Sequence, residues 1–225
     1  MTQAEKTSAP ATGSAKVWIF NPFAFVAGAR ALAVGLAVIL LAALLCWVTN
    51  THFDGAIDIH PGLSAPLVMF VIEGLTDWLS LSVMLMLAGL TVRRSSYRVV
   101  DVFGTQALAR WPYIITPVML LIVPPFRNAF ANVADEALKA AKSGALPNMA
   151  GSDLVLIVMA SVVILCCVIW GVMLMYRAYA MSCDTRGAKS IVSFIVAVIA
   201  AEILSKVILH SAFAHLTSGT QAAKP

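Results

Sequence analysis

Two acidic side chains stand within a long apolar stretch of this chain, where an ionised group is costly. Glu73 and Asp77 lie four residues apart between Leu67 and Val92, so a helix would place both carboxylates on one face, and Ser80 would extend the polar stripe. A charge at membrane depth costs about 2.5–3.5 kcal/mol on insertion scales and normally faces a bundle interior, a partner or water. We expect both acids near the outer end of a span, where water could solvate them.

A second charged pair repeats this spacing near the C-terminus. Glu202 and Lys206 lie between Ile191 and Leu209, and their opposite charges can neutralise each other. Arg110 and Arg177 supply further counter-charges. Two interpretations remain open for these groups: carboxylates with raised pKa values that load and release protons along a path, or a polar cluster that fixes the register of the helices. We favour the structural interpretation.

The segment HFDGAIDIH, residues 52–60, contains two histidines and two aspartates, which are residue types that bind zinc and similar ions. Their spacing matches no established metal motif, and the alternating apolar residues equally suit a chain that follows the membrane surface. We therefore predict neither a metal site nor a cofactor.

Catalytic patterns are missing from the sequence. It contains no HExxH, no GxSxG, no P-loop and no dinucleotide glycine fingerprint. Ser152 and Asp153 are better explained as the start of a helix than as a nucleophile with its partner, since no histidine lies near them. We expect no catalytic residues and no enzymatic activity.

Composition indicates which elements position these groups. Of the 225 residues 60% are hydrophobic and only 12% are charged, and the mean hydropathy is +0.90, whereas soluble domains are roughly half apolar and a quarter charged. The net charge of +4 comes from basic residues beside apolar runs, which argues against a nucleic-acid partner. The four cysteines form no disulfide framework. The chain is predicted to be an integral membrane protein with free thiols.

The predicted fold class is all-α, a polytopic transmembrane helix bundle with about five spans and interfacial amphipathic helices. Asn21 and Pro22 should begin a short interfacial helix, and residues 126–142 should form a surface helix with one apolar face. The third span is predicted to be kinked and buried in protein, because prolines interrupt it. The predicted spans are Ala31–Val48, Leu67–Val92, residues 99–125, Leu154–Tyr176 and Ile191–Leu209.

We divide the chain into a disordered polar tail (residues 1–20), a transmembrane domain (21–210) and a flexible C-terminal tail (211–225). Basic residues near the span ends predict a cytoplasmic N-terminus. The residues on this predicted cytoplasmic side are Lys16, Arg30, Arg93, Arg94, Arg98, Arg177, Arg186 and Lys189.

Two segments carry a resemblance to a known family. The stretch YRVVDVFGTQALARWP, residues 97–112, is followed much later by WGVMLMYRAYAMSCDTRGAKSIVSFIVAVIAAEILSK, residues 170–206. Over residues 21–209 the chain resembles small bacterial members of the Yip family, multi-span membrane proteins with a Yip-one domain. Eukaryotic members are associated with Rab GTPases and membrane traffic, so the resemblance implies a membrane-organising or partner-binding scaffold. The likeness to bacterial members implies a location in a bacterial inner membrane.

The resemblance also implies which positions would form a working surface: Asp101, Gly104, Thr105, Arg110, Pro112, Tyr176, Cys183, Gly187, Lys189, Glu202, Ser205 and Lys206. Packing is the competing explanation for each of them. The candidate intramembrane polar cluster therefore comprises Glu73, Asp77, Asp101, Thr105, Arg110, Arg177, Glu202 and Lys206. Expected partners are membrane lipid and a membrane or cytoplasmic protein, with a homo-oligomer left open. A proton- or ion-coupled transporter of small solutes is the alternative function.

Overall fold

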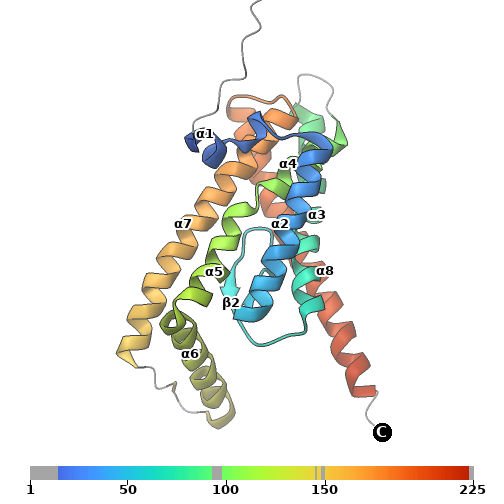
Figure 1. The fold of residues 1–225 in the computed structure, drawn as a ribbon. Coiled ribbons are helices and arrows are strands. Elements are labelled where there is room, and N and C mark those ends of the chain that lie inside the picture. The colour runs from blue at the N-terminus through green and yellow to red at the C-terminus, as the bar shows by residue number, and fades with distance from the viewer. Residues whose placement is uncertain (1–14, 93–97, 145, 148–149, 223–225) are drawn as a thin grey trace, which may run out of the picture.

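The computed structural model of the chain describes residues 15–92, 98–144, 146–147 and 150–222. Figure 1 shows these residues as long helices gathered side by side into an elongated bundle. In chain order the elements are α1 (Ala15–Phe20), the 3₁₀ turn η1 (Pro22–Ala24), α2 (Gly28–Thr49), β1 (Thr51–His52), β2 (His60–Pro61), α3 (Leu67–Val92), α4 (Val99–Leu108), the 3₁₀ turn η2 (Trp111–Ile114), α5 (Ile115–Ile122), α6 (Pro124–Ser143), α7 (Gly151–Ser182) and α8 (Ala188–Ala222).

Four helices in the described part of the chain are long and apolar enough to cross a membrane: α2, α3, α7 and the Ala188–Phe213 portion of α8. A fifth crossing results if the bent pair of Val99–Ile122 with α6 is counted as one span. Large apolar side chains on the outer faces of these helices remain exposed in the single chain, as expected where lipid is the solvent. The predicted all-α bundle of about five spans is confirmed.

The third span is a helix interrupted by a 3₁₀ turn. Pro112 stands in the first turn of η2, and the backbone bonds Arg110 N–H to Ala107 O and Tyr113 N–H to Arg110 O carry the chain from α4 into α5. After Val123 the axis bends by 88° into α6, whose first residue is Pro124. Proline suits a first helical turn because it has no N–H to satisfy. The predicted kink and the separate helix after it are both confirmed.

Glycines permit the close crossing of α2 and α4. A Cβ on Gly104 would lie only 2.6 Å from the carbonyl oxygen of Gly28, and a Cβ on Gly35 would overlap Ala107. Small residues let helix backbones approach closely in membranes, where packing and not water drives association. Gly104, a position implied by the family resemblance, therefore has a packing role.

Between α2 and α3 the chain turns back into the bundle. We call residues 51–62 the inserted loop; its ends pair as the short antiparallel strands β1 and β2, and Figure 1 shows its tip reaching back between the helices. Phe53, Ala56 and Ile59 are buried, so the interpretation of this segment as a chain on the membrane surface was wrong. Irregular backbone is tolerated at membrane depth only where protein or a water-filled cavity surrounds it.

The ends of the chain contain more helix than predicted. Part of the predicted tail, Ala15–Phe20, is α1, and α8 continues to Ala222, through most of the predicted C-terminal tail. Asn21 stands before η1 without a side-chain capping bond, and that helix is a single 3₁₀ turn. The predictions for residues 1–14, Arg93 and Arg94 lie outside the described residues.

Candidate functional site

Glu73 on α3 holds the first strand of the inserted loop. Its Oε1 lies 2.7 Å from Nδ1 of His52, and its Oε2 accepts a hydrogen bond of 3.1 Å from the backbone N–H of Phe53. Glu73 has no exposed surface, so the prediction that water solvates it was wrong. Both carboxylate oxygens instead bind the loop, which replaces water as the polar partner.

The second nitrogen of His52 determines how this pair can be protonated. Nε2 lies 2.8 Å from the carbonyl oxygen of Leu63, and since a carbonyl only accepts, Nε2 carries a hydrogen. One proton is then shared between Nδ1 and the Glu73 carboxylate. Burial lowers the pKa of His52, but the hydrogen bonds to Glu73 and Leu63 outweigh burial, so its pKa lies above the ordinary value. The imidazolium form strengthens the contact with Glu73.

Glu202 on α8 holds the tip of the same loop. Its Oε2 accepts a hydrogen bond of 3.0 Å from the backbone N–H of Ile57, and its Oε1 lies 3.2 Å from Nζ of Lys206. Lys206 also reaches Oδ2 of Asp58 at 2.7 Å. A Cβ on Gly55 would overlap the Glu202 carboxylate, so a larger residue there would have to displace that carboxylate from its present position. The predicted pair of Glu202 and Lys206 is present, and each member also binds a residue of the inserted loop.

Asp77 lies one helical turn beyond Glu73 and differs from it in the hydrogen bonding of its carboxylate. The residue is fully buried, and neither carboxylate oxygen has a hydrogen-bond partner among the described residues, so the expectation of solvation by water was wrong here too. Arg110 is near enough for an attractive electrostatic interaction, while its guanidinium donates to the carbonyl of Ala56, 3.4 Å away. Asp77 is therefore a buried acid with a neighbouring positive charge.

A small cavity lies beside this arginine. It has a volume of about 20 Å³ and is lined by Arg110 and Tyr113 together with apolar residues of α2 and α3. Nε of Arg110 and the hydroxyl of Tyr113 have no partners among the described residues. The volume suits about one water molecule, which needs polar partners of this kind. The cavity is too small for a solute larger than water.

The predicted cluster of eight residues divides into two groups. The first group lies around the inserted loop and comprises Glu73, Asp77, Arg110, Glu202 and Lys206. The other three lie near the opposite end of the bundle. There Thr105 bonds the Ser182 hydroxyl at 2.9 Å, Arg177 donates to the Phe20 carbonyl at 2.6 Å, and Asp101 lies 4.0 Å from Arg98. Those contacts join α1, α4 and α7 and do not reach the intramembrane acids.

Three of the four loop residues considered as metal ligands come together. Side-chain ligand atoms of Asp54, Asp58 and His60 lie within 4.8 Å of one another, whereas His52 turns to Glu73. His60 lies 3.3 Å from Asp54, and Lys206 pairs with Asp58 and, against the effect of burial, lowers its pKa. This local charge balance accounts for the grouping of the three side chains.

Sequence reasoning missed the role of the inserted loop. His52 bonds the carboxylate of Glu73, Ile57 donates its N–H to that of Glu202, and Gly55 leaves space for it. The candidate cluster contained none of these three residues. A pattern in the sequence could have indicated them: a loop with two histidines and a glycine follows one span and precedes a span with two acids.

Comparison of the chain with protein-family models, with curated proteins and with solved structures finds no match.

Proposed function

We propose that this protein is a non-enzymatic membrane scaffold of Yip type that acts through contacts with lipid and with protein partners. One observation carries the proposal: the intramembrane carboxylates of Glu73 and Glu202 bind backbone and side-chain groups of the inserted loop. Carboxylates engaged in this way fix the arrangement of helices. The cavity beside Arg110 and Tyr113 has room for about one water molecule.

The outer surface of the bundle also supports a role in binding lipid or other membrane proteins. Apolar side chains along α7 and α8, such as Val158, Val162, Val196 and Ile203, are exposed in the single chain. Such faces suit lipid, a second copy or another membrane protein. Among the described basic residues, Arg30, Arg98, Arg177 and Lys189 belong to helix ends that gather at one end of the bundle, with α1 (Figure 1), whereas Lys139 and Lys142 lie on α6. This distribution supports a cytoplasmic N-terminus, while the proposed bacterial inner membrane rests on the family resemblance.

A proton- or ion-coupled transporter is the second candidate, and Asp77 favours it. A buried carboxylate with no hydrogen-bond partner among the residues that the structure describes, close to Arg110, is the kind of group that proton relays use. The bent third segment, Val99–Ile122 with α6, adds the interrupted backbone on which transporters build their binding sites.

A flux measurement separates the two candidates. The purified protein is reconstituted in vesicles with an internal pH-sensitive dye, and proton entry after a pH jump is compared with that of protein-free vesicles. The scaffold proposal predicts equal rates for the wild type, Asp77→Asn and Glu202→Gln. Faster entry in the wild type that is lost in either variant would overturn the scaffold proposal in favour of the transporter.

A further inference from the structure

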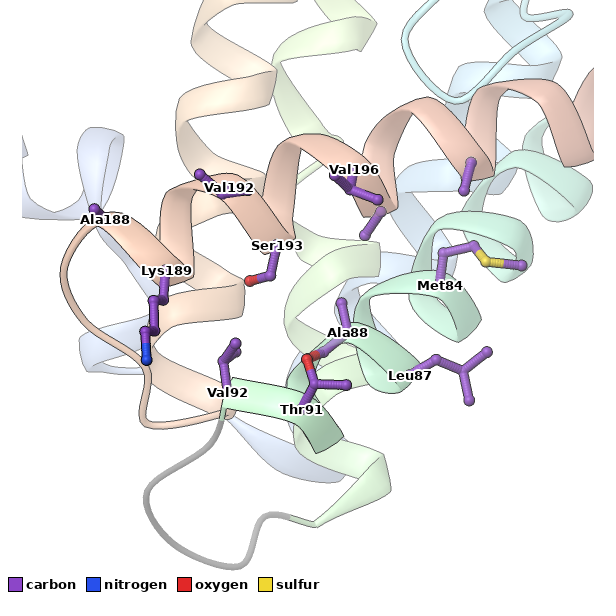
Figure 2. A pocket seen from close by; sticks show the side chains of 12 residues that line it. Met84, Leu87, Ala88, Thr91, Val92, Ala188, Lys189, Val192, Ser193 and Val196 are labelled. Carbon is purple, nitrogen blue, oxygen red and sulfur yellow. The ribbon is translucent and has the colours of Figure 1, made fainter.

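A groove runs along the bundle where the end of α3 meets the start of α8. It has a volume of about 680 Å³, within the range of about 300–1,000 Å³ that is typical of ligand sites. Its walls are largely aliphatic, as Figure 2 shows for Met84, Leu87, Val192 and Val196. Because both helices are long and apolar enough to cross a membrane, we expect the groove to open toward lipid.

Small residues create this groove. Ala88 on α3 faces the groove, as do Ala188, Ala197 and Ala200 on α8, and each leaves space that a larger aliphatic side chain would fill. On the other side of α3, Gly89 packs tightly against Cys183. The Gly89 face of α3 is therefore held close to the α7–α8 turn, while the Ala88 face of α3 lines the open groove.

One end of the groove carries a positive charge. Lys189, in the first turn of α8, lines it, and Figure 2 shows its side chain extending on the side of α8 that faces Val92. Lys189 forms no ion pair with any residue that the structure describes, and it is exposed. Arg186 precedes it in the exposed turn. An occupant with an apolar chain and an anionic head would match both the walls and the charge.

We propose that the groove binds one anionic phospholipid, with an acyl chain along α3 and α8 and the phosphate at Lys189. Basic residues at a membrane surface attract anionic headgroups, and Lys189 lies at the end of the bundle where the other basic helix ends gather. The inference rests on the proposed scaffold role and names one lipid class that the scaffold contacts. It is independent of the inserted loop, which belongs to the other end of α3.

Native mass spectrometry of the intact protein tests the site. The protein is released from micelles containing either phosphatidylglycerol or phosphatidylcholine, and the lipid retained per chain is measured. We expect the wild type to retain one phosphatidylglycerol preferentially, and Lys189→Ala to reduce that retention about three- to tenfold, because one surface lysine supplies an attraction of that order. Lys142→Ala, at an exposed lysine of α6, is the matched control and should retain the lipid.

A second variant tests the apolar part of the groove. Ala88→Leu, at a half-buried position, should fill the groove and reduce retention of both lipids while the melting temperature stays within a few degrees. Equal retention of the two lipids by the wild type, with no effect of Lys189→Ala, would overturn the proposal. So would a dimer that Ala88→Leu abolishes without changing lipid retention, because the occupant would then be a second copy. Neither outcome alters the flux measurement, so failure of this inference is distinguishable from failure of the scaffold proposal.

Discussion

Gly55 lies directly against the carboxylate of Glu202, 147 positions later in the chain, and the absence of a side chain is what permits the contact. The same carboxylate accepts the Ile57 N–H. A residue in a loop after the first span and a residue in the last span thereby fix each other. This contact joins the inserted loop to α8.

Replacing Gly55 with alanine should separate the loop from α8. The new methyl group would occupy the position of the Glu202 carboxylate, so the Ile57 N–H would lose its acceptor, and we expect a loss of about 1–3 kcal/mol in the free energy of unfolding. Thermal unfolding in detergent measures the change. Gly151→Ala is the control, since nothing lies within 4 Å of a Cβ there, and an equal effect of both substitutions would contradict the contact.

Substitutions of Glu202 should distinguish its charge from its hydrogen bond. Glu202→Gln keeps an oxygen that can accept the Ile57 N–H, whereas Glu202→Ala leaves that half-buried donor without its carboxylate partner. We expect the alanine variant to lose about 2–3 kcal/mol of stability and the glutamine variant less than half of that. Unfolding curves of both variants under one set of conditions provide the comparison. A glutamine variant as unstable as the alanine variant would show that the hydrogen bond contributes little.

The stability of the bundle should depend on pH through His52. Its pKa is raised in the folded protein above the ordinary value of about 6.5, so its stabilising contribution is fully present below that ordinary value and is lost as the pH rises through the raised folded value. Melting temperatures between pH 5.5 and 9 should therefore fall with rising pH more steeply in the wild type than in His52→Gln.

His60→Gln controls for the other histidine of the loop, whose ring is half exposed and lies 3.3 Å from Asp54. We expect this variant to keep the pH dependence of the wild type. If His52→Gln and the wild type have parallel pH profiles, the contact between His52 and Glu73 does not contribute to the stability as described.

Gly104→Ala should loosen the crossing of α2 and α4. The added Cβ would press on the backbone oxygen of Gly28, 2.6 Å away, and a helix backbone cannot yield as a flexible side chain can. We expect a loss of about 1–3 kcal/mol, measured by the same unfolding assay. Stability equal to that of the wild type would show that the helices cross at a greater distance.

Much of this fold could be predicted because its signals are local. Apolar runs located the spans, and the limits predicted for the second span, Leu67 and Val92, match α3. Prolines indicated the kink in the third span, and the apolar face of residues 126–142 indicated the helix after it, although α6 begins two residues earlier, at Pro124. The spacing of Glu73 and Asp77 indicated a common helix face, and both are buried there.

The partners of the acids could not be predicted because those contacts are distant in sequence. His52 and Glu73 are separated by 21 residues, and Ile57 and Glu202 by 145. The alternation of apolar residues in the loop is the same whether the chain follows the membrane surface or enters the bundle. Only the packing of Phe53 and Ile59 among the helices distinguishes these alternatives.

The inserted loop is buried among the helices, and cysteine accessibility at Ala56 tests this burial. Ala56 has no exposed surface and Leu63, just after the loop, is 70% exposed. Ala56→Cys and Leu63→Cys are made with the four native cysteines replaced by alanine, and labelling by a membrane-impermeant maleimide is followed in nanodiscs, where both faces are open. We predict that Cys at position 63 reacts at least about a hundredfold faster than Cys at position 56, because the buried thiol reacts only when the structure opens. Equal labelling rates at the two positions would contradict the account.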